Sequence, residues 1–373
     1  FKKNYTPSIE AQFSENSVNQ YYRKAIEKLK LSPINQGQIT HLSFHESQDL
    51  VFKIEFEIKP EIKLPNYKKK FKVSAVKYIS SKKDMDDSLA DMQNRFATMK
   101  EIKDGAQKDH FLFVDLQELE SGAPVIGKKI EKQYVRLGFG AFKGDALKTM
   151  KGIKQGDTRN VTIDIEGKKV DYEVTVHKVE EQKIPKLDDK FAKTVEPGIK
   201  TLTELKKKVK ANIEQTFENE HIKEVNNSII SYFVDKTKFD APESMIQNYL
   251  EHIIENNKSQ QPGMTEDQEK ETRDSGLEGA IFNVKWYLIK EQIVNSEKIT
   301  VSKEDMDKKT NELIAKEPQN ENSIKDFLKS PENQQRFFDD MLSEKLFTYL
   351  SDYVNIKIKK KKSDDLRKEQ GGA

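Results

Sequence analysis

A long succession of helical patterns fills the second half of the chain and constrains its fold more than any other feature. From residue 185 almost to the end, apolar residues recur at spacings typical of amphipathic helices. Thr201 and Glu204 form a capping box, which satisfies free backbone amides at a helix start, and the apolar face that follows extends to Phe233. Further helices are predicted over residues 244–259, 265–296, 302–315, 323–329 and 331–354.

The first third of the chain mixes helix and strand patterns. Residues 8–31 have apolar positions three to five apart and predict a long helix. Residues 50–62 alternate apolar and charged side chains, which is typical of a half-buried strand, and a second strand is predicted over residues 70–79. A capping box then opens a helix over residues 81–100.

Between these regions the pattern changes to short strands separated by glycines. A tight hairpin is predicted at Glu166-Gly167. The sequence therefore predicts a small α+β domain over residues 106–182, with strands over residues 110–116, 134–137, 159–165 and 170–179.

Composition limits how compact the molecule can be and which partners it can attract. Hydrophobic residues make up 35% of the 373-residue chain and charged residues 34%, which favours elongated modules, two or three in number, over one large core. The 65 basic and 63 acidic residues leave a formal net charge of +2. No global field therefore draws the chain to nucleic acid, and any contact with an anionic partner has to be local.

Several classes of site are excluded by missing residues and spacings. The chain has no cysteine, so it forms no disulfide, thiolate metal site or cysteine nucleophile, which fits a reducing compartment. The six histidines are scattered, and no phosphate loop or serine-nucleophile elbow is present. We predict no cofactor, no metal and no membrane span. Because the chain opens on FKKNYTPSIE, we expect it to begin inside a longer protein.

Three segments resemble bacterial trigger factor, in that family's order. Residues 1–7 (FKKNYTP) are similar to its G-F-R-K-G-x-x-P signature, with lysine in place of arginine and Asn4 in place of a glycine. Residues 54–60 (IEFEIKP) resemble the end of its first domain. Residues 179–192 (VEEQKIPKLDDKFA) resemble its V-x-E-x-x-L-P-x-L-D-x-x-F-A exit from the middle domain.

The resemblance implies an elongated, multidomain α+β protein. It has an N-terminal α/β ribosome-docking domain, a small FKBP-like α+β domain and an all-helical C-terminal chaperone domain with arms. The implied boundaries are residues 1–65 for ribosome docking, 66–105 for a linker strand and helix, 106–182 for the FKBP-like domain and 183–356 for the helical domain. The lysine run at residues 359–362, followed by polar residues, separately predicts a disordered tail over residues 357–373.

The resemblance also implies a function, partners and a location. The chain is expected to be an ATP-independent chaperone that binds nascent or unfolded polypeptides at the ribosome, on the large subunit near the tunnel exit. It is expected to be cytoplasmic and to form a homodimer through its docking domain. No membrane and no sequence-specific nucleic acid are expected among its partners.

Two sets of residues are expected to make these contacts. Phe1, Lys2 and Lys3 would dock on the ribosome, because an apolar anchor beside cations suits a surface of protein and phosphate. Four apolar side chains of the helical region would contact clients, since burial of apolar surface is not directional. These are Met245, Tyr249, Phe282 and Trp286.

The FKBP-like domain is expected to carry a degenerate isomerase pocket. Such enzymes need a dry aromatic pocket around the prolyl bond. Asp115 matches the family's acid, but Leu116 replaces an aromatic residue, and the segment around Leu147 lacks the usual isoleucine and proline. Tyr172 is left as the one pocket aromatic, so little or no isomerase activity is expected.

Two rival functions stay open at this point. The first is an active prolyl isomerase with helical extensions, which requires Leu116, Leu147 and Tyr172 to form a dry pocket. The second is a periplasmic isomerase-like chaperone with a similar helical body, which requires a signal peptide upstream of Phe1.

Overall fold

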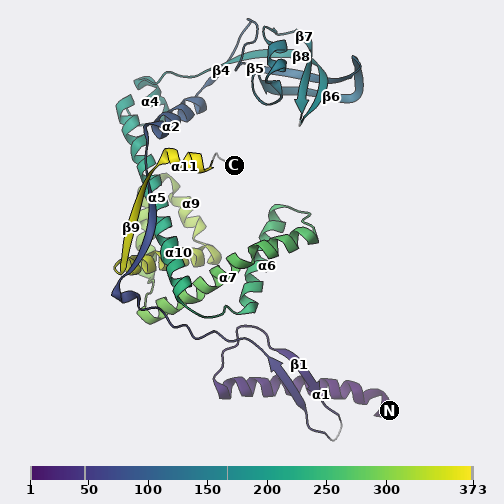
Figure 1. Cartoon of the computed structure of the whole chain (residues 1–373), viewed down its shortest axis with the longest axis vertical. Helices are drawn as coiled ribbons and strands as arrows, with labels where there is room; N and C mark the ends of the chain where they lie inside the picture. Colours follow the sequence, from purple (N-terminus) through teal and green to yellow (C-terminus); the bar gives the residue numbers. More distant parts are fainter. Residues whose placement is uncertain (1, 46–47, 166, 371–373) are drawn as a thin grey trace. The chain divides into compact units, whose positions relative to one another are not determined.

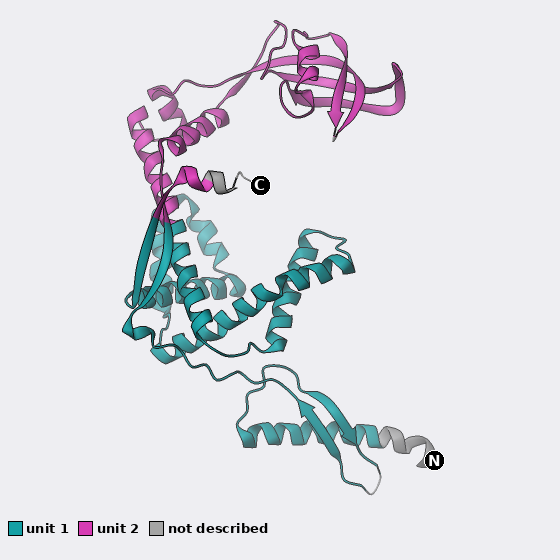
Figure 2. Ribbon diagram, viewed as in Figure 1, with its two compact units in different colours: residues 1–76, 220–359 teal, residues 77–219, 360–373 magenta. Residues whose placement is uncertain are grey.

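The computed structural model describes residues 2–45, 48–165 and 167–370 (Figure 1). The chain divides into two compact units (Figure 2). Unit 1 comprises Phe1–Val76 with Glu220–Lys359, and unit 2 comprises Lys77–Asn219 with Lys360–Ala373. Each unit therefore combines segments that are distant in the sequence.

The first segment of unit 1 pairs a helix with a hairpin. Helix α1 (Lys2–Leu29) begins earlier than predicted, and strands β1 (Gln38–Ser43) and β2 (Val51–Glu55) form an antiparallel pair. Phe56, directly after β2, contacts Tyr22 of the helix, with ring centroids 5.5 Å apart. Strand β1 was not predicted, because its sequence QITHLS is largely polar and mostly exposed.

The helical region agrees with the prediction to within a few residues at each boundary. Thr201 and Glu204 make the predicted capping box, with Glu204 N donating to Thr201 Oγ1 at 3.2 Å. Helix α5 then begins in unit 2 and ends in unit 1. The helices are α5 (Leu202–Lys236), α6 (Glu243–Gln260), α7 (Glu266–Glu297), α8 (Lys303–Lys316), α9 (Glu321–Phe327) and α10 (Pro331–Ser351).

A partly buried carboxylate ties three of these parts of unit 1 together. Glu297, at the end of α7, accepts hydrogen bonds from Lys68 Nζ at 2.8 Å and from the Tyr349 and Tyr67 hydroxyls at 2.6 Å each. These donors, Lys68 foremost, lower the pKa of Glu297 to about 2. The segment before strand β3 (Phe71–Ile79) and helix α10 are thereby joined to α7, beside a core that contains Phe233, Ile289 and Leu350.

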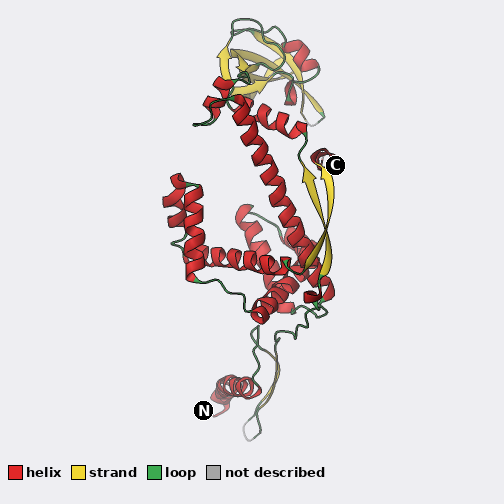
Figure 3. Ribbon diagram, turned by 90° about the vertical axis from the view of Figure 1, so that its left-hand side faces the viewer, coloured by secondary structure: helices red, strands yellow, loops and turns green. Residues whose placement is uncertain are grey.

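The predicted disordered tail is wrong for residues 357–370. Residues Val354–Lys362 form strand β9, which pairs with β3 (Phe71–Ile79) in a two-stranded sheet (Figure 3). Helix α11 (Ser363–Gln370) follows. The lysine run indicated a solvated tail, but a strand can keep lysines in water when its backbone is paired with another strand.

The predicted helix over residues 81–100 is too long by several residues. Helix α2 (Lys82–Arg95) ends early, and Met99 lies in strand β4 (Thr98–Glu101), which pairs with the end of strand β8 (Lys168–Lys183). Helix α4 (Asp189–Val195) is capped by Asp188, whose carboxylate accepts from Phe191 N at 2.8 Å. Helices α2, α4 and α5 share a core built on Leu89, Phe191, Ala192, Leu205 and Val209.

The small domain of unit 2 is a twisted sheet with one short helix. Its strands are β5 (Phe111–Glu120), β6 (Ala123–Arg136), β7 (Thr158–Ile165) and β8 (Lys168–Lys183), in the order β4-β8-β5-β6 with β7 also on β8. Strand β6 is much longer than the predicted 134–137. Gly127 and Lys132, both at positive φ, lie within it where its pairing with β5 shifts register. Helix α3 (Asp145–Met150) covers one face of the sheet, here called the inner face.

Candidate functional site

The inner face of the small-domain sheet is filled by its own side chains. Leu116 and Tyr172, predicted pocket residues, are only 9% and 7% exposed and belong to one core with Phe142 and Met150. Leu147 packs on the same core from α3. The structure thus brings three of the four predicted pocket residues together in one core. Leu116 and Tyr172 are buried there, and Leu147 is partly buried.

Asp115, the fourth predicted pocket residue, is separated from the other three. It alternates along β5 with the buried Val114 and Leu116, so its side chain lies on the opposite face, here called the outer face. There it accepts from Lys132 N at 2.9 Å and pairs with His177 Nε2 at 3.0 Å and Lys129 Nζ at 3.2 Å. The expected grouping of Asp115 with Leu116, Leu147 and Tyr172 is therefore wrong.

The contacts of Asp115 define what it can do chemically. The backbone amide of Lys132, followed by His177 and Lys129, lowers the pKa of Asp115 to about 2. The carboxylate is ionised at neutral pH and unsuited to general acid or base catalysis, which requires a pKa near the working pH. Its role is to hold the bulge of β6 against β5.

The outer face carries an aromatic cluster that sequence reasoning missed. Phe111 and Phe113 alternate with buried residues of β5, and Tyr134 lies opposite them on β6, with ring centroids 5.7 and 6.2 Å from theirs. Tyr134 is 51% exposed. The Arg136 guanidinium lies 5.5 Å from the Phe111 ring centroid and 3.9 Å from that of Phe139. We call these five residues the outer aromatic face.

The predicted client residues of the helical region divide into exposed and packed members. Tyr249 of α6 is 37% exposed. Trp286 of α7 is partly buried. It packs against the core and stacks on Phe347, with ring centroids 6.1 Å apart. Met245 packs on a second core between α6 and α7, and Phe282 is half-buried.

Other apolar side chains of α7 are more accessible than those predicted. Tyr287 is 55% exposed, and Leu277 is also exposed. The hairpin of α6 and α7 that presents them is held by Arg273, which donates to Gln247 at 3.0 Å and to Glu251 at 2.7 Å. Apolar residues occur on several sides of α7, so periodicity alone did not separate the exposed ones from the buried ones.

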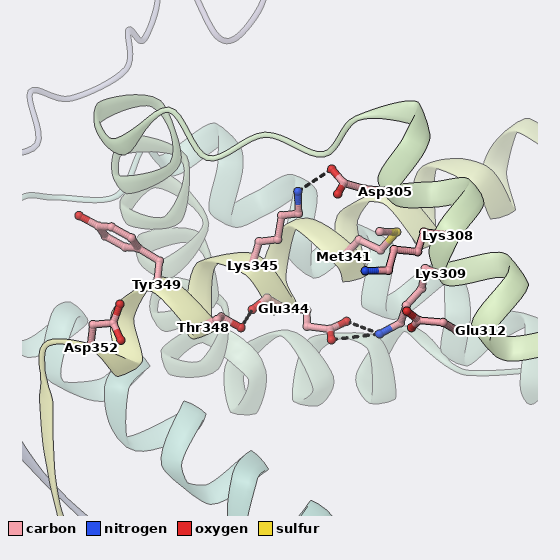
Figure 4. A pocket seen from close by; sticks show the side chains of 10 residues that line it. All are labelled: Asp305, Lys308, Lys309, Glu312, Met341, Glu344, Lys345, Thr348, Tyr349 and Asp352. Atoms are coloured by element: carbon pink, nitrogen blue, oxygen red, sulfur yellow. Dashed lines mark hydrogen bonds and ion pairs between the residues drawn. The ribbon is translucent and has the colours of Figure 1, made fainter. Parts of the chain in front are cut away.

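A groove of about 400 Å³ lies between α8 and α10 (Figure 4). Met341 and Tyr349 contribute to its lining, and ion pairs cross it. Lys309 Nζ contacts Glu344 at 2.7 Å, and Lys345 Nζ contacts Asp305 at 2.5 Å. Lys345 is the first cause that lowers the pKa of Asp305 to about 2. These paired charges join the two helices, and three more charged residues, Lys308, Glu312 and Asp352, also line the groove.

The ribosome-docking residues lie where the structure gives no contacts. Phe1 lies outside the described residues, as do the side chains of Lys2 and Lys3. Among the residues that are described, no group of three or more histidine or acidic side chains is placed to hold a metal ion. Within the same residues, no helix has the length and apolar character needed to cross a membrane.

Comparison with known proteins gives consistent matches along the chain. The family "Bacterial trigger factor protein (TF)" matches residues 1–92, and "Bacterial trigger factor protein (TF) C-terminus" matches residues 201–352. The chain is 26% identical over 307 residues to trigger factor of Geobacillus kaustophilus, covering 77% of this chain and 72% of the relative. It is 24% identical over 383 residues to that of Desulfotalea psychrophila, covering 98% and 87%.

A solved structure is also similar to this chain. It comes from work on "Promiscuous Substrate Recognition in Folding and Assembly Activities of the Trigger Factor Chaperone". The TM-score is 0.49 at 16% identity, and the match covers 92% of this chain and 85% of that one.

Proposed function

Because the chain belongs to the trigger factor family of ribosome-associated folding chaperones, we propose that it binds nascent and unfolded polypeptides without ATP, on the large subunit near the tunnel exit. The observation that supports client binding is the exposure of large apolar side chains in both units, such as Tyr134 and Tyr287. Contacts of this kind are individually weak and not directional, so many client sequences fit and clients leave without an energy source.

Client holding is tested by light scattering during dilution of a chemically denatured protein. The full chain is expected to suppress aggregation when it is present in stoichiometric amounts, with no change on adding ATP. Suppression that requires ATP, or no suppression at any ratio, contradicts the proposal.

Ribosome docking is assigned in this proposal to Phe1, Lys2 and Lys3, in a cytoplasmic protein. The support is the family match over residues 1–92, which includes all three positions. A variant with Phe1→Ala, Lys2→Ala and Lys3→Ala is expected to lose co-sedimentation with ribosomes while it still suppresses aggregation. Co-sedimentation at the parent level contradicts the assignment.

The proposal includes no prolyl isomerase activity. The support is that Leu116 and Tyr172 are buried and that Asp115 faces the other side of the sheet. A homodimer formed through the docking domain is a further part of the proposal, and it rests on the family alone. Sedimentation equilibrium of the full chain tests it, because a dimer has twice the monomer mass of 43.2 kDa.

A further inference from the structure

Two segments that are far apart in the sequence bring charge of a single sign together. Residues 62–83 contain eight lysines and no acidic residue, and residues 353–363 contain five lysines and no acidic residue. The strands inside these segments, β3 and β9, pair with each other. Phe71 N donates to Tyr353 O at 3.1 Å, which sets the starts of the two strands side by side.

Some of these lysines are neutralised, and others are not. Lys68 pairs with Glu297 and Lys77 with Glu218. A further group within unit 1 is exposed and has no hydrogen-bond or ion-pair partner for its amines among the described side chains. We call this group the basic ribbon: Lys69, Lys70, Lys72, Lys357 and Lys359.

The ribbon presents its charge with regular spacing and little apolar surface beside it. Residues two apart on a strand lie on one face about 6.6 Å apart, and this is the relation between Lys357 and Lys359. Ile356 and Ile358 alternate with them and therefore project from the other face. The nearby aromatic ring of Phe71 is buried in the core, so it is not free to stack on a base.

We infer that the basic ribbon binds the phosphate backbone of single-stranded nucleic acid without sequence preference. Lysine acts as a point charge for phosphate, and each contact releases counterions from a strand that carries one charge per nucleotide. A chain of formal net charge +2 attracts such a strand only where its cations are locally uncompensated, and the ribbon meets that condition. The residues of this site differ from those of the proposed client surfaces and from residues 1–3.

Lysines on an edge strand also have a simpler use. They discourage two sheets from pairing edge to edge, and β9 belongs to a sheet of only two strands. This alternative predicts that removing the lysines causes self-association and leaves nucleic-acid binding unchanged. The two readings therefore differ in what a charge-neutralising variant does.

Fluorescence anisotropy of a labelled oligouridylate with the full chain, over a range of salt concentrations, tests the inference. The variant carries Lys72→Gln, Lys357→Gln and Lys359→Gln. The matched control carries Lys190→Gln, Lys206→Gln and Lys207→Gln in unit 2. It removes the same charge from exposed lysines that have no ion-pair partner among the side chains that the structure describes. We expect the ribbon variant to bind at least tenfold more weakly, with a salt slope lower by about 2, at roughly 0.7 per lysine.

Further measurements test which part of the nucleic acid is contacted, whether another polyanion binds equally well, and whether the site is correctly placed. Single-stranded DNA of matched length is expected to bind as tightly as RNA, because only phosphates are contacted, and a strong preference for RNA overturns the backbone-only contact. Polyglutamate that binds as tightly as RNA overturns the assignment to nucleic acid. Equal weakening in both lysine variants, or self-association of the ribbon variant with unchanged RNA affinity, overturns the site.

Discussion

The two faces of the small-domain sheet show how one pattern of apolar residues yields both a core and an exposed surface. On the inner face, Leu112, Val114 and Leu116 are covered by α3 and the loops around it. On the outer face, Phe111 and Phe113 of the same strand contact the half-exposed Tyr134, and they also contact His177 and Arg136. Hydrophobic character alone therefore does not mark a core position, because covering elements decide which face is closed.

Among the substitutions that compare the two faces, truncation of a buried inner-face residue is expected to change the free energy of unfolding most. Leu116→Ala removes buried methyl groups and leaves a cavity, so it should lower the free energy of unfolding by about 3 kcal/mol. Urea unfolding of the full chain, followed by a probe in the small domain, measures the change. A loss below about 1 kcal/mol would mean that Leu116 lines an open pocket after all.

Asp115 provides an intermediate effect with a defined pH dependence. Its pKa is lowered to about 2 in the folded state, below the ordinary value near 4, so its contribution to stability is complete above that ordinary value and is lost as the pH falls toward 2. Asp115→Asn should cost about 1 to 2 kcal/mol at pH 7. The difference from the parent chain should shrink in acid, and a difference that is constant with pH would contradict this role.

Substitution on the outer face should have a small effect on stability. Tyr134 is half-exposed, and Tyr134→Ser should change the free energy of unfolding by no more than about 0.5 kcal/mol. Thermal unfolding of the variant and of the Leu116→Ala chain, measured together, compares the two faces directly. Equal losses would show that the outer face is as well packed as the inner one.

The smallest expected effect is on prolyl isomerisation. Because Leu116 and Tyr172 are buried, the full chain should not accelerate the proline-limited refolding phase of a substrate that is followed at low chaperone concentration. An acceleration that disappears in the Tyr172→Ala variant would show that the domain is an active prolyl isomerase with a pocket on the inner face.

Local signals in the sequence were sufficient for the helical region and insufficient for the sheets. The capping box of Thr201 and Glu204 acts within four residues and occurs where it was predicted, and the acid cap at Asp188 is equally local. Strand β9 depends on pairing with β3, almost three hundred residues earlier, and its lysines resemble those of a solvated tail. No local signal reports such a partner.

The candidate site was predictable in residue type but not in exposure. Trp286 and Tyr287 are adjacent aromatics on α7, yet the first packs on Phe347 and the second faces water. The same limit explains why the opposite positions of Asp115 and Leu116 were not predicted. Both faces of β5 carry apolar residues, and alternation does not indicate which face is covered.

Site-specific photocrosslinking tests the central claim, which is that exposed apolar side chains of this protein bind unfolded polypeptides. The chain has no cysteine, so a photoreactive label can be attached at one position through Tyr134→Cys, with Thr162→Cys on the polar part of the same outer face as a matched control. A denatured client is expected to crosslink at position 134 several times more than at position 162, and not after the client has refolded. Equal yields at the two positions, or equal yields with a folded client, would contradict the account.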